Sequence, residues 1–142
     1  MSRPLIISDC DEVLLHMVAH FKQWLEESQG VVFNLDGHDF ARALRWQESG
    51  ELLEPADIWR MLGRFFDHEM DRQTPIEGAV EGIAKLAEQA DVVILTNLVD
   101  ERREKRAEQL AAFGIRARVF TNQGPKGPAL KKIIEEFEPT RA

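Results

Sequence analysis

Two acidic side chains directly follow an apolar run near the start of the chain. The run Leu5–Ser8 (LIIS) comes after Pro4, and Asp9 and Asp11 follow it with Cys10 between them. Short apolar runs of this kind are typical of strands buried on both faces, as in parallel sheets. In an open parallel sheet, ligands bind beyond the carboxyl ends of the strands. The sequence therefore predicts two carboxylates at the place where such a sheet binds a ligand.

Two further runs are expected to be strands of the same sheet. Val92–Leu95 (VVIL) is β-branched and is followed by Thr96 and Asn97. Arg116–Phe120 (RARVF) ends in the loop TNQGPKGP, which carries Lys126 and has the composition of a turn. Because the carboxyl ends of parallel strands meet at one edge, we expect a hydroxyl, an amide and an ammonium group near the acidic pair.

Helical patterns separate and follow these strands. Residues 78–89 repeat apolar side chains at three- and four-residue spacing, and residues 101–113 have helical composition between a potential N-cap, Asp100, and Gly114. A last helix is expected to start near Pro128. The basic residues of the second helix alternate with glutamates and are expected to form a solvated face; they are Arg102, Arg103, Lys105 and Arg106. This order predicts an α/β fold with a Rossmann-like parallel sheet.

A long insert interrupts the chain after the first strand. Residues 1–13 and 76–142 are expected to form the sheet core, and residues 14–75 a mostly helical insert. Three helices are expected in it, over residues 14–28, 38–49 and 55–70. All three tryptophans and five of the eight phenylalanines of the chain fall in the insert. This aromatic content predicts that the insert has a small core of its own or packs as a lid on the sheet.

Composition limits the partners that the chain can have. The 142 residues carry a formal net charge of −7, which argues against nonspecific nucleic-acid binding. A single cysteine cannot form an internal disulfide and favours a reducing, cytoplasmic location. That thiol, Cys10, is expected to be structural, with a pKa kept high by the neighbouring carboxylates. No segment has the length of a signal peptide or a membrane span.

The convergent side chains predict phosphate chemistry. Two close carboxylates are costly unless a cation lies between them, and a hard cation such as Mg²⁺ prefers oxygen ligands. The Thr96 hydroxyl, the Lys126 ammonium group and free backbone N–H groups can hold an anion such as phosphate. One carboxylate can attack phosphorus, while the other protonates the leaving group and then activates water.

Three stretches of the sequence resemble motifs of the haloacid dehalogenase superfamily. DCDEV after the first apolar run resembles its first motif, VVILTN its second and GPKGPALKKI its third. The insert matches the helical cap of many members in size and position. The resemblance implies a capped, Mg²⁺-dependent phosphatase that acts on a small phosphorylated metabolite.

The same resemblance implies a role for each matching residue. Asp9 would be the nucleophile and a Mg²⁺ ligand. Asp11 would be the general acid and base, with its backbone carbonyl also contacting the metal. Thr96, with Asn97, would bind the transferring phosphoryl group, and Lys126 would neutralise the charge of the nucleophile and the phosphate. Members that cleave carbon–halogen bonds lack the second aspartate, so Asp11 favours phosphate chemistry.

One family motif has no match in the sequence. The fourth motif is an acidic residue at the end of another strand, but only IEEFEPTRA follows the third motif. The missing strand would pair beside Leu5–Ser8, so we expect an exposed edge there. Three alternatives follow: the chain is truncated, it is degenerate, or a second copy covers the edge in a homo-oligomer. Truncation is favoured, because EFEPTRA is typical of the approach to a strand.

Two other functions remain open on the same residues. A non-catalytic binding protein on this scaffold would explain the missing fourth motif. A phospho-accepting signalling domain also groups an acidic pair, a hydroxyl and a lysine at strand ends. The long insert directly after the acidic strand counts against the signalling domain, which connects there through a short loop and one helix.

Overall fold

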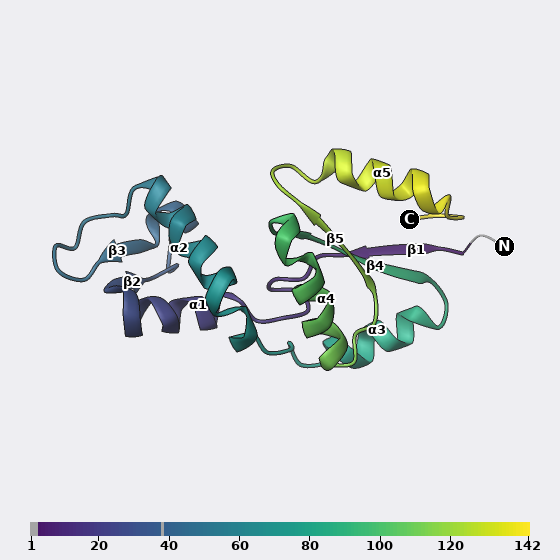
Figure 1. The fold of residues 1–142 in the computed structure, drawn as a ribbon, viewed down its shortest axis with the longest axis horizontal. Coiled ribbons are helices and arrows are strands. Elements are labelled where there is room, and N and C mark those ends of the chain that lie inside the picture. Colours follow the sequence, from purple (N-terminus) through teal and green to yellow (C-terminus); the bar gives the residue numbers. More distant parts are fainter. Residues whose placement is uncertain (1–2, 38) are drawn as a thin grey trace. The chain divides into compact units, whose positions relative to one another are not determined.

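The chain forms two compact units (Figure 1). The computed structural model describes residues 3–37 and 39–142. The sheet unit comprises Met1–Leu15 and Pro75–Ala142, and the inserted unit comprises His16–Thr74; the boundaries expected from the sequence were 13/14 and 75/76. Within the described ranges, neither unit has a helix that is long and apolar enough to cross a membrane.

A three-stranded parallel sheet lies at the centre of the sheet unit. Its strands are β1 (Leu5–Ser8), β4 (Asp91–Asn97) and β5 (Arg118–Asn122), in the order β1-β4-β5. Apolar, partly β-branched runs form these strands because both faces of the sheet are covered. The predicted α/β class with a Rossmann-like parallel sheet is confirmed.

Helices cover both faces of this sheet. They are α3 (Ala79–Ala87), the short 3₁₀ helix η4 (Asp100–Arg102), α4 (Arg103–Ala112) and α5 (Gly127–Phe137). Alternate residues of β4 point to opposite faces. Val93 and Leu95 pack with Ile133 of α5, whereas Ile94 packs with Ile83 of α3 and Leu110 of α4. In Figure 1, α5 lies on one side of the sheet and α3 and α4 lie on the other.

The sequence predicted the C-terminal end of the helical segment around α4 correctly, but not its N-terminal end. The expected N-cap at Asp100 is wrong: Val99 is the residue before η4, and the Asp100 carboxylate accepts hydrogen bonds from Thr121 and Gln123 instead. The expected glycine after the helix is confirmed, because Gly114 has a φ of +99°. Only glycine adopts that conformation without steric cost.

The inserted unit has its own aromatic core. Its elements are α1 (Val18–Trp24), the π-helix η1 (Leu25–Gln29), β2 (Val31–Phe33), the 3₁₀ helix η2 (Phe40–Arg42), β3 (Leu44–Trp46), α2 (Pro55–His68) and the 3₁₀ helix η3 (Met70–Arg72). The ring of Phe21 contacts those of Trp24, Phe33, Phe40 and Phe65, with centroids 5.4–6.2 Å apart. The predicted aromatic core is therefore present within this unit.

Two of the expected helices in the insert differ from the structure. The helix over 38–49 is wrong: Leu44–Trp46 is a strand that pairs antiparallel with Val31–Phe33, and its expected first residue, His38, lies outside the described residues. The apolar spacing of that segment suits a helix, but pairing with the β-branched run of β2 overrides it. The first helix begins at Val18, because Leu14 and Leu15 are buried in the core of the sheet unit.

The outer edge of β1 is covered at its amino-terminal end. The Leu5 N–H group donates to the Arg141 carbonyl oxygen at 2.8 Å, and the Thr140 N–H group donates to the Arg3 carbonyl oxygen at 3.3 Å. These two bonds give part of this edge the backbone partners that an unpaired edge strand lacks. The expectation of a fully exposed edge is therefore wrong for the residues around Leu5.

Two glycine substitutions test the role of the turn after α4. We expect Gly114→Ala to lower the free energy of unfolding by about 1–2 kcal/mol, because alanine is strained at positive φ; the added Cβ would also lie 3.4 Å from Val80 Cγ1. Gly82→Ala is the matched control in α3, where a Cβ would meet nothing within 4 Å. It should raise the free energy of unfolding by about 0.5–1 kcal/mol. Urea denaturation measures both, and equal effects would contradict the argument.

Candidate active site

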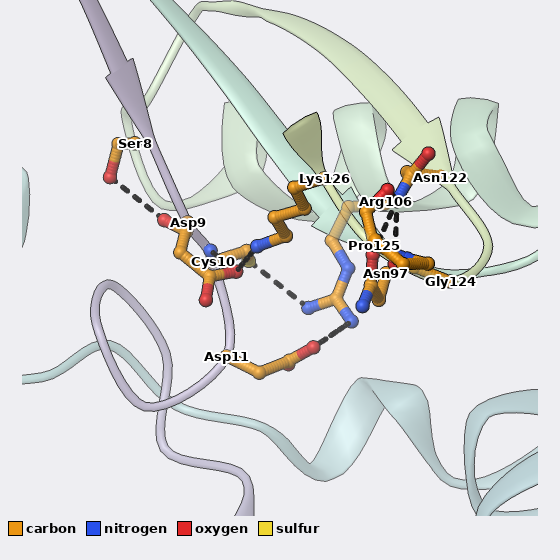
Figure 2. A network of polar contacts seen from close by, with 10 residues as sticks. All are labelled: Ser8, Asp9, Cys10, Asp11, Asn97, Arg106, Asn122, Gly124, Pro125 and Lys126. Carbon is orange, nitrogen blue, oxygen red and sulfur yellow. Dashed lines mark hydrogen bonds and ion pairs between the residues drawn. The ribbon is translucent and has the colours of Figure 1, made fainter. Parts of the chain in front are cut away.

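Three strand ends meet at the carboxyl edge of the sheet. Ser8 at the end of β1 pairs with Ile94, and Asn97 at the end of β4 pairs with Asn122 at the end of β5. The residues that follow these strands therefore come from distant parts of the sequence but occupy one edge. Figure 2 shows the polar contacts that link them.

The first carboxylate of the acidic pair forms an ion pair with the loop lysine. Lys126 Nζ lies 3.1 Å from Asp9 Oδ1, and the backbone N–H group of Cys10 donates to the same oxygen at 2.7 Å (Figure 2). The Asp9 side chain is 45% exposed. Across residues 3–37 and 39–142, Asp9 Oδ2 has no hydrogen-bond or ion-pair partner. One oxygen of this carboxylate is therefore held, and the other remains accessible for reaction.

A side-chain amide shapes the loop that carries the lysine. Asn122 Nδ2 donates to the carbonyl oxygens of Gly124 and Pro125 and to Asn97 Oδ1, at 2.9–3.2 Å. In the structure, Asn97, which was expected to bind substrate, contacts this second asparagine. The sequence did not predict a role for Asn122. Asparagine is common near turns, where its side chain forms hydrogen bonds with nearby backbone groups. These bonds place the loop, and with it Lys126, above the strand ends.

Thr96 lies at the end of β4 and is fully buried. Its Oγ1 has no hydrogen-bond partner among the residues that the structure describes. Leaving a buried hydroxyl unpaired costs about 1–3 kcal/mol, so such groups are rare in native proteins and often belong to functional sites. Thr96 lies at the carboxyl edge, as the sequence predicted, but its Oγ1 is closed off from solvent in this structure, so the phosphoryl contact stays a prediction.

The second carboxylate is held by Arg106, which the sequence predicted to lie on a solvated face. That prediction is wrong for Arg106, whose side chain is 0% exposed. Its Nη2 lies 3.2 Å from Asp11 Oδ1, and its Nη1 lies 3.3 Å from Cys10 Sγ (Figure 2). One signal was available: Arg106 precedes the buried Leu110 by four residues, so both lie on the same face of α4.

The surroundings of the Cys10 thiol, which lies between the two aspartates, make it unreactive. The pKa of Cys10 is raised to about 12, mainly by burial; Arg106 acts to lower it, and the carboxylates of Asp11 and Asp9 act to raise it. The sequence predicted a raised pKa for this thiol, but the carboxylates named as its cause contribute less than burial does. The cysteine is therefore a neutral packing residue of the loop.

Comparisons with known proteins identify the fold. No protein-family model matches the sequence, and no curated protein matches it. A haloacid dehalogenase-like family hydrolase from Xanthomonas campestris is similar in structure, with a TM-score of 0.54 and 19% identity over 97% of this chain and 70% of that one. A haloacid dehalogenase-like hydrolase from Burkholderia xenovorans LB400 has a TM-score of 0.56 and 15% identity over 98% of this chain and 69% of that one. The chain has the haloacid dehalogenase-like fold.

The donor atoms at this edge of the haloacid dehalogenase-like fold suit a magnesium ion. Mg²⁺ is commonly held by one or two carboxylates, with water and substrate phosphate completing six oxygen ligands. Asp9 offers an accessible carboxylate oxygen, and Asp11 lies two residues away. Among the described residues, no group of three or more His, Cys, Asp or Glu side chains is close enough to form a metal site. Because the Asp11 carboxylate is paired with Arg106, the chain would supply the Asp9 carboxylate and the Asp11 backbone carbonyl oxygen, and water and phosphate oxygens would have to supply the rest.

The burial of Cys10 predicts its reactivity. The thiol is 0% exposed, so we expect a thiol reagent such as 5,5′-dithiobis(2-nitrobenzoic acid) to leave the native protein unmodified and to react fully in 6 M guanidinium chloride. Absorbance at 412 nm counts the released thiolate. One rapid equivalent under native conditions would contradict the buried placement of this loop.

The Asp100 carboxylate, which follows β4, accepts hydrogen bonds from Thr121 and Gln123 at the end of β5. The pKa of this carboxyl group therefore depends on the contact between the two segments. Hydrogen bonds from the Thr121 hydroxyl and, less strongly, from the Gln123 amide lower the pKa of Asp100 below its usual value. Thr121→Val should therefore raise that pKa toward the usual value, and Gln123→Ala should raise it by less. Carbon-13 NMR titration of the Asp100 carboxyl measures both changes, and the reverse order would contradict the assignment.

Proposed function

We propose that the protein is a Mg²⁺-dependent phosphatase that hydrolyses a small phosphorylated metabolite through an aspartyl-phosphate on Asp9. One observation carries the proposal: the half-exposed Asp9 carboxylate is held on Oδ1 by Lys126 at 3.1 Å and by the Cys10 N–H group at 2.7 Å. This leaves Oδ2 as a positioned nucleophile at the edge of the sheet where ligands bind. The similarity of the fold to two haloacid dehalogenase-like hydrolases supports a hydrolytic function.

In the first step, Asp9 Oδ2 attacks the phosphorus atom of the substrate. A bond forms between this oxygen and phosphorus, and the bond between phosphorus and the leaving oxygen breaks. Asp11 donates its carboxyl proton to the leaving oxygen, so the product departs as an alcohol. Lys126 and the Cys10 N–H group offset the negative charge that gathers around the nucleophile.

In the second step, Asp11 acts as a base. Its carboxylate takes a proton from a water molecule, and the resulting hydroxide attacks the phosphorus atom of the aspartyl-phosphate. The bond between phosphorus and Asp9 breaks, which releases inorganic phosphate and restores both carboxyl groups. The two aspartates thus divide nucleophilic attack and proton transfer between them.

Binding of the phosphoryl group would use side chains from three elements. The Thr96 hydroxyl would donate to a phosphoryl oxygen, and the Lys126 ammonium group would contact another. The Asp9 carboxylate and the Asp11 backbone carbonyl oxygen would hold Mg²⁺, which when bound supplies positive charge that neutralises the phosphoryl oxygens. The local cations also let a chain of net charge −7 attract an anionic substrate at this one edge.

A non-catalytic binding protein is the second candidate. Each carboxylate already has a cationic partner within the chain, since Lys126 lies 3.1 Å from Asp9 and Arg106 lies 3.2 Å from Asp11. Two negative and two positive charges can therefore balance without a metal ion. Calorimetric titration with Mg²⁺ separates the candidates: a phosphatase binds the ion through Asp9, whereas a self-neutralised scaffold shows no heat of binding.

Substitution of the nucleophile tests the proposal. With Mg²⁺ and p-nitrophenyl phosphate, we expect Asp9→Asn to lower kcat/KM by at least about 10³-fold, because the amide cannot form the acyl phosphate. Lys126→Met should lower it by about 10²-fold through lost charge stabilisation. Removal of Mg²⁺ with EDTA should abolish turnover.

A second lysine provides the matched control. Lys131 is exposed on α5, one turn beyond the start of that helix, so Lys131→Met should leave kcat/KM unchanged within twofold. Full activity of Asp9→Asn in a folded sample would overturn the assignment of the nucleophile. Equal losses in both lysine variants would show that general charge, and not the contact with Asp9, matters.

A further inference from the structure

Helix α4 buries a charged side chain although its other charged residues have access to solvent. Arg103, Glu104 and Lys105 are exposed, whereas the Arg106 side chain is 0% exposed. Burying a guanidinium group costs several kcal/mol unless it is paired, and an apolar side chain of similar volume often packs there at no loss of stability. A stable core therefore does not require an arginine at this position, so its partners suggest another role.

The two terminal nitrogens of this arginine contact consecutive residues of the acidic loop. Nη1 lies 3.3 Å from Cys10 Sγ, and Nη2 lies 3.2 Å from Asp11 Oδ1 and 3.5 Å from Asp11 Oδ2. Figure 2 shows the guanidinium group reaching both side chains. The planar guanidinium group keeps its nitrogens at a constant separation, whereas a lysine offers a single nitrogen on a flexible chain. Only an arginine can hold both partners at once.

The backbone of the same loop is held in an unusual conformation. The Cys10 carbonyl oxygen accepts hydrogen bonds from the N–H groups of Val13, Leu14 and Leu15 at 2.8–3.2 Å. Glu12, the residue after Asp11, has a φ of +62°, which costs a residue with a side chain about 1–2 kcal/mol. Such strain persists only where the surroundings enforce it, and it is frequent at functional sites.

We propose that Arg106 is a positioning residue that fixes the Asp11 carboxylate for proton transfer beside Asp9. This inference rests on the proposed function, because it gives Asp11 its acid–base role. Arg106 is buried and does not contact substrate; it acts through Asp11, while the loop backbone holds the main chain of that residue. A displacement of about 1 Å in a catalytic group can cost about 10²-fold in rate, so loss of the two-point contact should lower kcat.

Enzyme kinetics test the inference with a variant that keeps the charge. Arg106→Lys should lower kcat by about 10–100-fold, while KM changes less than twofold because the proposed phosphate contacts of Thr96 and Lys126 remain. Asp11→Asn removes the group through which Arg106 acts, so adding Arg106→Lys to it should lower kcat less than twofold further. Arg103→Lys, at an exposed position one turn earlier, is the control and should leave kcat unchanged.

A double-mutant cycle distinguishes positioning from a structural role. If Arg106→Lys and Asp11→Asn lower kcat independently, their effects multiply in the double variant. Arg106 then does not act through Asp11. A fall in kcat in Arg103→Lys as large as that in Arg106→Lys would also overturn the inference.

NMR of the wild-type protein tests the contact without using activity or an Arg106 variant. A guanidinium group held at both terminal nitrogens rotates slowly, so Arg106 should show separate Nη–H resonances, whereas the exposed Arg103 should show an averaged one. Asp11→Asn should shift the Arg106 resonances. Averaged Arg106 resonances in the wild type would overturn the inference.

The failure of the proposed function and the failure of this inference can be told apart. If the wild type hydrolyses no phosphate ester, the proposed function fails, and the NMR result still decides whether Arg106 holds Asp11.

Discussion

Charge pairing at the carboxyl edge of the sheet is the constraint on which the rest of the site depends. Two carboxylates follow β1 with one residue between them, and each has a cation from a different helical segment. Lys126, directly before α5, pairs with Asp9, and Arg106 of α4 pairs with Asp11. Because α4 and α5 cover opposite faces of the sheet, the acidic loop is held from both layers.

The two ion pairs differ in burial, and this difference matches the division of labour that we propose. Asp9 and Lys126 are partly exposed, with side-chain accessibilities of 45% and 29%, so substrate can reach them. Arg106 is fully buried and Asp11 is 16% exposed, so water screens their attraction less. The Asp9–Lys126 pair is open to solvent, whereas the Asp11–Arg106 pair is largely shielded from it.

The insert shows where prediction from sequence fails. Residues 38–49 have apolar positions spaced as in a helix, but Leu44–Trp46 pairs with Val31–Phe33 as a strand. A strand depends on a partner elsewhere in the chain, and local periodicity contains no information about that partner. For the same reason, the composition of α4 predicted a solvated face and missed Arg106: a charged side chain is buried only when tertiary contacts supply its partners.

The sequence by itself determined the order of the strands and helices in the sheet unit, but the strand expected over Arg116–Phe120 is Arg118–Asn122, and the one expected to end at Leu95 runs to Asn97. Apolar runs, Gly114 and the acidic pair are local signals, and strand β1 was predicted residue for residue. Only the tertiary structure decided which cation meets which carboxylate. Asp11 and Arg106 are 95 residues apart in the chain, and their contact exists because parallel strand pairing brings the end of β1 beside the helix that follows β4.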